Sequence, residues 1–348
     1  MPCPPGFAGD AACPAAREAG GGTLAEPAGN APAGSVRRRE KLWQAARYRL
    51  TFEVLTPICL PDYAGSMLRG AFGLALRAVA CMTRERACPP CPLYAVCPYA
   101  LLFETPPPGE HPLQKFSSVP SPYIVEPPAW GRRVYNPGDM LSFHTVLFGR
   151  APEKLALVVF AWQRAFSRSV GHGTARPVDV SLVTPEGVVG VYDAGKGRLL
   201  PHDTALSVPA GSGPDFSLCF TTPLRLQENR RILPPAELTP RVLLTALLRR
   251  NSLLAEFHAG TAPDYDFQAM AAAAATVEYS HDLQWRHWVR YSNRQRQSMA
   301  LDGVVGHWRL RNVPECFHEH LYVGQWTHVG KNATFGLGQY HIEEQRKY

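Results

Sequence analysis

The sequence predicts an α+β protein built from two domains. The chain of 348 residues is longer than most single domains, and 45% of its residues are hydrophobic, which is enough for two separate cores. In each half, segments with the two-residue period of strands alternate with segments at helical spacing. Such alternation is typical of α+β domains.

The first half opens with the clearest strand pattern. Across residues 47–54 every second residue is apolar, which predicts a strand with one buried face. Residues 63–81 then place apolar side chains at helical spacing, and a cysteine- and proline-rich excursion follows to about residue 136. Beyond it the pattern predicts a strand, a helix, and a glycine-containing loop that runs into a strand: residues 140–148, 155–169 and 171–183.

The second half follows a similar order. A strand is predicted from Phe216. A helix is predicted from Thr239, a favourable N-cap followed by Pro240, to Gly260, a residue suited to the position after a helix. An alanine-rich helix and two strands should follow: residues 266–280, 303–310 and 320–326. Each half therefore fits a ferredoxin-like module of the kind found in RNA-recognition domains.

These patterns also suggest domain boundaries. We expect an N-terminal domain at residues 46–214, with a cysteine-rich insertion at 81–136, and a C-terminal domain at 215–348. Residues 1–45 are rich in Ala, Gly and Pro and lack the basic start and apolar core of a signal peptide, so we interpret them as a disordered or non-native leader. Because no apolar run approaches the ~20 residues needed to cross a bilayer, we expect no membrane role and a cytoplasmic protein.

The charge distribution favours a polyanionic partner. The formal net charge is +7, which could by itself also serve solubility. Residues 283–311 hold six arginines against a single acid, Asp302, with three tryptophans among them. Arginine makes bidentate contacts with phosphate and stacks on bases, so we expect the arginines to contact nucleic acid. The tryptophans either stack on bases or fill the core.

Residues 330–338, GKNATFGLG, give a second polyanion signal. Glycine lets main-chain N–H groups approach a phosphate, and Lys331 adds a positive charge. Asn332 tolerates the positive φ that such loops use. A glycine-rich hairpin turn without any ligand would have the same composition.

The glycine-rich loop is the last of four segments that together carry a family resemblance. In chain order they are TPLRLQENRRI from Thr222, LLRRNSLLAEFHAG from Leu247, RYSNRQRQSMALDGVVGHWRL from Arg290, and the loop itself. Together they resemble the pre-crRNA-processing endoribonucleases of CRISPR systems, members of the RAMP superfamily, whose loops read close to GKGTSFGLG. The resemblance covers about residues 47–342. It implies two tandem ferredoxin-like domains, binding of CRISPR repeat RNA, and metal-independent cleavage of precursor crRNA that leaves a cyclic phosphate. Other CRISPR effector subunits are the further partners that it implies.

Two groups of residues are expected to bind RNA on this basis. The glycine-rich loop contributes Gly330, Lys331, Asn332, Gly336 and Gly338. The second group consists of arginines spread over both halves of the chain: Arg77, Arg176, Arg225, Arg290, Arg294 and Arg296.

Metal-independent RNA cleavage needs a base for the 2′-hydroxyl proton, an acid for the leaving oxygen and a cation near the phosphate. The family often places a catalytic histidine in or just after the first helix, but residues 62–86 hold none. The candidate bases are His328, beside the glycine-rich loop, and His172, in GHGTAR, although a lone histidine is commonly only packed or solvated. The alternative is cleavage without a histidine, in which Tyr63, Arg69 and Arg77 position the nucleophile and neutralise charge.

The missing histidine supports a second hypothesis, a catalytically silent RNA-binding subunit of a CRISPR effector complex. A zinc-containing DNA-binding regulator is a third. Four cysteines within seventeen residues suit a tetrahedral structural zinc site: Cys81, Cys88, Cys91 and Cys97. Prolines among them disfavour helix and strand, so a metal would order the segment. Reduced inert thiols, an iron–sulfur cluster or a disulfide are the alternatives, and no cofactor is expected for catalysis.

Overall fold

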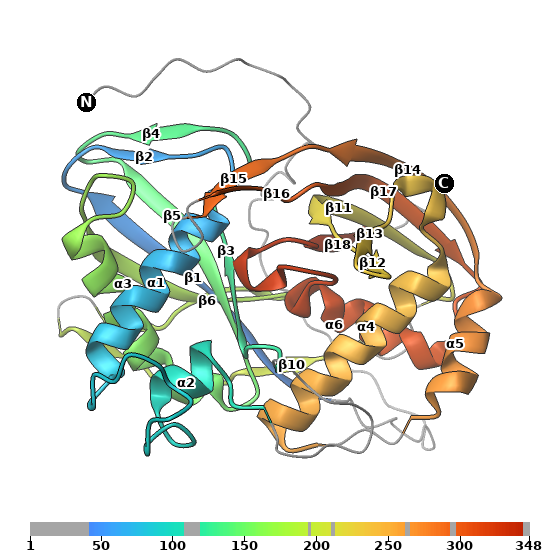
Figure 1. The fold of residues 1–348 in the computed structure, drawn as a ribbon, viewed down its shortest axis with the longest axis horizontal. Coiled ribbons are helices and arrows are strands. Elements are labelled where there is room, and N and C mark those ends of the chain that lie inside the picture. The colour runs from blue at the N-terminus through green and yellow to red at the C-terminus, as the bar shows by residue number, and fades with distance from the viewer. Residues whose placement is uncertain are drawn as a thin grey trace, which may run out of the picture.

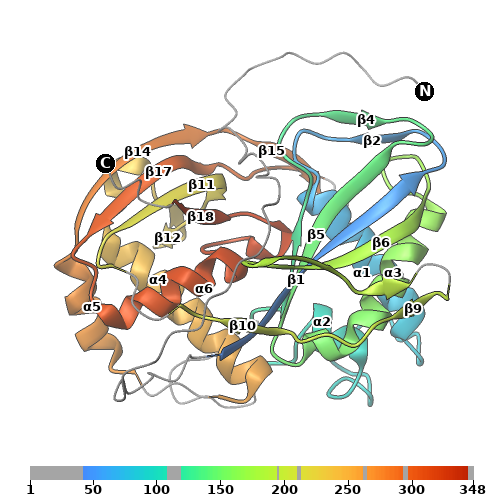
Figure 2. The same ribbon diagram turned by 180° about the vertical axis from the view of Figure 1, so that it is seen from behind.

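The computed structural model describes residues 42–107, 119–193, 196–209, 213–261, 265–292 and 297–343. Its two main sheets are antiparallel and stand side by side, and helices cover one face of each (Figure 1). The first half of the chain, blue to green, lies on the left in Figure 1, and the second half, yellow to red, on the right. Figure 2 shows the same two halves from behind.

The N-terminal domain has the element order strand, helix, strand, strand, helix, strand: β1 (Leu42–Val54), α1 (Gly65–Ala80), β3 (Tyr123–Glu126), β5 (Met140–Phe148), α3 (Leu155–Arg168) and β6 (Ala175–Thr184). Its sheet runs β3-β5-β1-β6 and continues to the edge strand β7 (Gly187–Gly190), while β10 (Ala205–Ser207) pairs with the start of β1. The alternating apolar residues of β1 are buried, as the sequence predicted. They pack with Phe72 of α1 and Trp162 of α3, whose rings are stacked with centroids 4.9 Å apart.

The C-terminal domain repeats this topology. Its elements are β11 (Phe216–Leu224), α4 (Pro240–Leu254), α5 (Phe267–Ala275), β14 (Glu278–Arg286), β17 (Gly303–Arg311), α6 (His318–Thr327) and β18 (Tyr340–Glu343). The sheet order is β14-β17-β11-β18. In both domains the first strand lies between the third and the fourth, and the second is next to the third, which is the ferredoxin-like arrangement. The predicted tandem ferredoxin-like fold is confirmed.

The short elements lie around these two cores. They are the paired strands β2 (Ile58–Leu60) and β4 (Arg133–Tyr135), β8 (Tyr192–Asp193) and β9 (Arg198–Leu199), β12 (Gln227–Glu228) and β13 (Arg231–Ile232), β15 (Val289–Ser292) and β16 (Gln297–Ala300), and the helix α2 (Pro98–Phe103). Strands β15 and β16 lie where the two domains meet, at the top of Figure 1. None of the described helices is long and apolar enough to span a bilayer.

The helix boundaries of α4 follow from its end residues. The hydroxyl of Thr239 accepts a hydrogen bond from the Val242 N–H at 3.4 Å, and Pro240 occupies the first turn. The helix continues as a π-helical turn, Ala255–Ala259, and ends at Gly260, which has a φ of 69°. These predictions are confirmed.

Other predicted elements need correction. The segment 320–326, rich in apolar and aromatic residues, was predicted to be a strand but lies in α6, where residues on all sides of the helix are buried and no alternation marks a strand. The helix predicted at residues 266–280 ends earlier, because α5 stops at Ala275 and β14 begins at Glu278. Strand β3 lies inside the predicted insertion, since it pairs with β5 in the N-terminal sheet. Residues 42–45, expected in the leader, begin β1.

A shared hydrophobic cluster joins the two domains. Ile124 and Phe148 of the N-terminal sheet belong to one buried cluster with Leu254, Val323 and Trp326 of α4 and α6. Burial of apolar surface across the junction fixes the two domains relative to each other. The junction is therefore a rigid place on which a site can be built.

Candidate active site at the domain junction

The glycine-rich loop packs against the N-terminal domain. The Tyr63 hydroxyl, just before α1, donates a hydrogen bond of 2.8 Å to the carbonyl of Phe335. A Cβ on Gly65 would lie 2.0 Å from the same carbonyl oxygen, and a Cβ on Gly336 would lie 2.6 Å from the Tyr63 hydroxyl. The glycines on both sides are therefore needed for close packing across the junction.

The backbone of the glycine-rich loop forms hydrogen bonds within the protein. Gly336 and Gly338 have φ values of 90° and 69°, and Asn332 has 68°, the positive φ that the sequence suggested. The N–H groups of Lys331, Gly336 and Gly338 donate to the carbonyls of Arg225, Ala333 and Pro223. These three N–H groups are committed inside the fold. The exposed side chain of Lys331 is the part of the loop best placed to meet a phosphate.

Beneath the loop, a buried charged cluster crosses the junction. Nε2 of His328 lies 2.9 Å from Oε1 of Glu126, and the Arg47 guanidinium donates to the same carboxylate at 2.9 Å. Arg47 also donates to the carbonyl of Gln325 at 2.7 Å. Burial raises the pKa of Glu126, but Arg47 and His328 outweigh it and hold that pKa well below its usual range. The carboxylate is therefore charged and paired.

His328 has a structural position. Its side chain is 0% exposed, and burial lowers its pKa even though Glu126 acts in the opposite direction. Its φ of 54° is rare for a residue other than glycine, and such a conformation persists only where surrounding contacts impose it. A general base must touch the 2′-hydroxyl. Since the side chain of His328 is fully enclosed, it does not reach the surface where RNA would bind.

Tyr63 belongs to an aromatic cluster above the same loop. Its ring centroid lies 4.9 Å from that of Trp130 and 5.0 Å from that of Trp288, and Phe335 packs with them. Burial, and then the charge of Glu126, raise the pKa of Tyr63 well above its usual value. The phenol is therefore protonated and bonded to Phe335, which gives it a packing role in this structure.

An exposed histidine lies at the edge of this aromatic cluster. Nδ1 of His287 is 3.3 Å from Oδ2 of Asp302, and the His287 side chain is 80% exposed. The other carboxylate oxygen of Asp302 accepts a hydrogen bond of 3.0 Å from the Trp288 N–H. Next to His287, the Arg286 guanidinium lies over the Trp130 ring, 5.0 Å from its centroid. An oriented imidazole and an arginine are thus neighbours on the surface of the junction.

Arg225 connects this pair to the glycine-rich loop. Its guanidinium donates to the carbonyl of Asp302 at 2.8 Å, and its own carbonyl accepts from the Lys331 N–H at 2.9 Å. Arg225 is 8% exposed, and burial lowers its pKa against the effect of Asp302. The structure therefore places Arg225 as a buried link between the loop and Asp302.

Sequence reasoning missed His287. It lies within the arginine-rich segment, and Asp302 is the only acid of that segment, so both residues carried a signal. Their proximity depends on the pairing of β14 with β17, which brings Arg286 opposite Gly303. Distances along the chain did not reveal it.

Two predicted arginines serve the first helix and the cysteine-rich segment. The Arg69 guanidinium lies over the Phe103 ring, 4.3 Å from its centroid. Arg77 donates to the carbonyls of Glu85 and Arg86. Both side chains thus hold the segment that follows α1.

The other predicted positions lie elsewhere. Arg176 of β6 forms an exposed ion pair with Glu53 at 2.6 Å. His172 is exposed in the tight turn between α3 and β6, with a φ of 72°. Arg290 lies in β15 with its side chain outside the described part of the chain, and Arg294 and Arg296 lie outside the described residues altogether.

The four cysteines line one cavity of about 170 Å³: Cys81, Cys88, Cys91 and Cys97. Burial, followed by the charge and hydrogen bonding of Glu104, raises the pKa of Cys88 to about 11. Among the residues that the structure describes, no three of these sulfurs lie within 4.8 Å of one another. The cavity gathers the thiols without bringing them to the separations of zinc ligands.

Comparison with known families decides the class of protein. Residues 218–340 match the family model of the CRISPR-associated endoribonuclease Cas6. The C-terminal domain is a Cas6 endoribonuclease domain. Residues 42–204 match a second family model, described as an N-terminal domain. The predicted family and the predicted endoribonuclease acting on pre-crRNA are confirmed at this level.

Solved Cas6 structures share the fold. A product complex of Cas6 from Thermus thermophilus is 15% identical over 86% of this chain and 99% of that chain, with a TM-score of 0.54. A partial Cas6-RT-Cas1–Cas2 complex is 13% identical over 87% of this chain and 46% of that chain, with a TM-score of 0.52. At such identities the likeness concerns the fold alone. A search of curated protein sequences finds no match.

Proposed function

We propose that this Cas6 protein binds CRISPR repeat RNA and cleaves pre-crRNA at the domain junction without a metal ion, with His287 as the general base. The observation that carries the proposal is the exposed imidazole of His287, oriented by Asp302 at 3.3 Å. It stands beside Arg286 and the aromatic cluster that seats the glycine-rich loop. A cytoplasmic location follows from the proposed RNA substrate.

The chemistry uses these groups in order. In this proposal the contact with Asp302 keeps the proton of the neutral imidazole of His287 on Nδ1, which leaves Nε2 as the proton acceptor. Nε2 takes the 2′-hydroxyl proton, the 2′-oxygen attacks the adjacent phosphorus, and the bond to the 5′-oxygen breaks. The products are a 2′,3′-cyclic phosphate and a 5′-hydroxyl, whose proton comes from water. Arg286 neutralises the charge that grows on the phosphate, and Asp302 stabilises the imidazolium.

RNA recognition would rest on shape and charge. The proposed substrate is a repeat RNA hairpin, and double-stranded RNA is recognised mainly through its backbone and its shape. Arg225 links Lys331 to Asp302 through two hydrogen bonds, so the exposed Lys331 lies near the proposed base His287 and its partner Asp302. Trp130, half-buried under Arg286, offers a ring on which an unpaired base next to the stem can stack.

The proposal also includes protein partners and a structural metal ion. The likeness to a Cas6-RT-Cas1–Cas2 complex supports other CRISPR proteins as partners. The cavity that the four cysteines line, in a segment whose prolines disfavour helix and strand, supports a structural zinc in the cysteine-rich segment. This metal would order the chain and take no part in cleavage.

The test of the proposed base is single-turnover cleavage of a labelled repeat hairpin in EDTA. His287→Ala should lose ~10²-fold or more of the rate while binding the hairpin normally. His172→Ala should keep the wild-type rate, since His172 lies in a turn of the N-terminal domain. The reverse result would transfer the role of base to His172.

A catalytically silent RNA-binding subunit is the second candidate function. It is favoured by the absence of histidine from residues 62–86, where the family often carries its catalytic one. The same assay separates the two functions. Hairpin binding by the wild-type protein without any cleavage would identify the silent subunit.

A further inference from the structure

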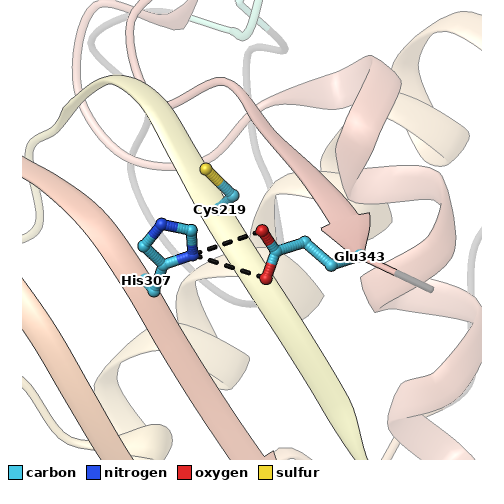
Figure 3. Close-up of side chains that lie close together, drawn as sticks. All are labelled: Cys219, His307 and Glu343. Atoms are coloured by element: carbon cyan, nitrogen blue, oxygen red, sulfur yellow. Dashed lines mark hydrogen bonds and ion pairs between the residues drawn. The ribbon is translucent and has the colours of Figure 1, made fainter. Parts of the chain in front are cut away.

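Three potential metal ligands meet on the C-terminal sheet, apart from the proposed active site. Cys219, His307 and Glu343 come from β11, β17 and β18, and their side chains lie close together (Figure 3). One ligand atom from each lies within 4.8 Å of the other two. No other group of three among the described His, Cys, Asp and Glu residues meets this condition.

The sheet itself imposes the arrangement. Cys219 is paired directly with His307 on one neighbouring strand and with His341 on the other, so these three side chains share one face. Glu343 follows His341 by two residues and therefore points to the same face. A site on three paired strands is held more precisely than one on a loop.

The distances suit one small ion. Nδ1 of His307 lies 3.3 Å from Oε1 and 3.4 Å from Oε2 of Glu343. Two ligands of a tetrahedral ion with bonds of about 2.1 Å are about 3.4 Å apart. The Ser217 hydroxyl donates to Oε2 of Glu343 at 2.8 Å and holds the carboxylate in place, as hydrogen bonds to metal-binding carboxylates commonly do.

The mixed donor set selects the metal. A thiolate is a poor ligand for Mg²⁺ and Ca²⁺, which prefer oxygen, whereas zinc accepts sulfur, nitrogen and oxygen together. The exposure of the ligands also fits. Cys219 is 2% exposed, while the side chains of His307 and Glu343 are 42% and 34% exposed, so an ion can enter from the side of the imidazole and the carboxylate.

We propose that Cys219, His307 and Glu343 bind one Zn²⁺ ion, with His341 or a water molecule as the fourth ligand. Binding releases the thiol proton of Cys219, so that the bound thiolate and carboxylate balance the charge of the ion. The ion ties β18, a strand of four residues, to β11 and β17. Since β18 begins two residues after Gly338, the zinc also anchors the end of the glycine-rich loop.

The first test is the metal content of full-length protein grown with added zinc and purified without chelator. Cys219→Ser should hold about one zinc fewer per chain than the wild type. Cys316→Ser removes an exposed cysteine outside the cluster and should match the wild type. Cys88→Ser reports separately on the four-cysteine cavity and should keep the zinc of this site.

A second measurement covers the chance that Cys219→Ser folds poorly. Glu343→Gln keeps the size of the side chain and should weaken zinc binding about 10-fold or more in competition with a chelating dye. Zinc added to the chelator-treated wild type at a hundredfold excess over its Kd should raise Tm by about 5 °C. Both effects are independent of RNA cleavage.

Cobalt(II) gives the spectroscopic signature. In the Cys88→Ser background, cobalt should produce a thiolate charge-transfer band that disappears when Cys219→Ser is added. Equal zinc content in folded wild-type and Cys219→Ser proteins, with no change of Tm on adding zinc to Glu343→Gln or to the wild type, would overturn the proposal. His307 and Glu343 would then form only an ion pair.

Discussion

His328 of the C-terminal domain and Glu126 of the N-terminal domain form a buried hydrogen bond of 2.9 Å across the domain junction. Arg47 supplies the positive charge that this carboxylate needs. Together they fix the start of the glycine-rich loop relative to β3, and thereby the position of the loop beside Tyr63. The buried charges thus serve the geometry of the site that lies above them.

Breaking this cluster should destabilise the protein strongly. Glu126→Ala removes the buried carboxylate that the Arg47 guanidinium and Nε2 of His328 contact, which should cost about 3–5 kcal/mol of the free energy of unfolding. Glu53→Ala removes an exposed ion pair with Arg176 and should cost no more than about 1 kcal/mol. Urea denaturation of both variants measures the difference, and equal midpoints would contradict it.

The same cluster predicts that the protein loses stability at pH values well above those at which ordinary carboxylates titrate. Burial lowers the pKa of His328, so the unfolded chain takes up a proton near the usual histidine pKa of ~6.5 while the folded protein does not. This stabilisation is complete above about pH 6.5 and is lost as the pH falls toward the folded pKa. The lowered pKa of Glu126 adds a further loss below about pH 4.3.

Thermal unfolding at a series of pH values checks this prediction. Tm of the wild type should fall between pH 7.5 and 5.5, and His328→Gln, which retains a donor for Glu126, should fall less steeply. Burial also lowers the pKa values of His144 and His258, which contribute in the same direction. The Tm of His328→Gln should therefore still fall somewhat as the pH is lowered. A flat wild-type profile would show that His328 is protonated in the folded state.

The sequence predicted the elements whose signals are local. The alternation in β1 and the Thr239 cap depend only on neighbouring residues, and both agree with the structure. α6 was mistaken for a strand because its burial on all sides, together with β-branched and aromatic residues, erases the helical stripe. Gly324 within it lets the Tyr340 hydroxyl approach, a contact that appears only after folding.

Only those parts of the site that carry a local signal could be predicted from the sequence. The glycine-rich loop and Tyr63 were identified from composition and resemblance, and the structure brings them together. The pairing of His287 with Asp302 and that of His328 with Glu126 join residues distant in sequence. Nothing local distinguishes the exposed histidine from the enclosed one, because burial is a property of the complete fold.

Gly336→Val should lower the stability of the protein, and any weakening of RNA binding should follow from that loss. A Cβ at this position would meet the Tyr63 hydroxyl, Pro127 and the carbonyl of Val125 at 2.6–2.8 Å, and the φ of 90° disfavours any side chain. We expect a loss of at least about 2 kcal/mol in stability, with weaker RNA binding as a consequence. Circular dichroism melting measures it.

Gly70→Ala is the matched control for this glycine. It lies in α1 with nothing within 4 Å of the added Cβ, so the change should stabilise the protein by up to about 1 kcal/mol. A Gly336→Val protein with the Tm of the wild type would show that the junction adapts to the side chain.

Tyr63→Phe separates packing from catalysis. The change removes the hydrogen bond to the Phe335 carbonyl and keeps the ring, so stability should fall by about 1 kcal/mol. The cleavage rate should stay within about threefold of the wild type, because the raised pKa of Tyr63 keeps the phenol protonated and its proton is engaged. A loss of 100-fold or more in a folded variant would instead support cleavage by tyrosine and arginine.

Lys331→Ala tests whether the loop meets the RNA backbone through its side chain. The plot of log K for hairpin binding against log salt should become shallower by about 0.7 to 0.9, the contribution of one phosphate contact. The N–H of Lys331 stays bonded to Arg225 in the variant, so the fold and the position of Asp302 should not change. Lys196→Ala, an exposed lysine next to Asp193 in the N-terminal domain, is the control and should leave the slope as it is. An unchanged slope for Lys331→Ala would mean that the loop only supports the junction and that Arg286 and its neighbours carry the contacts to phosphate.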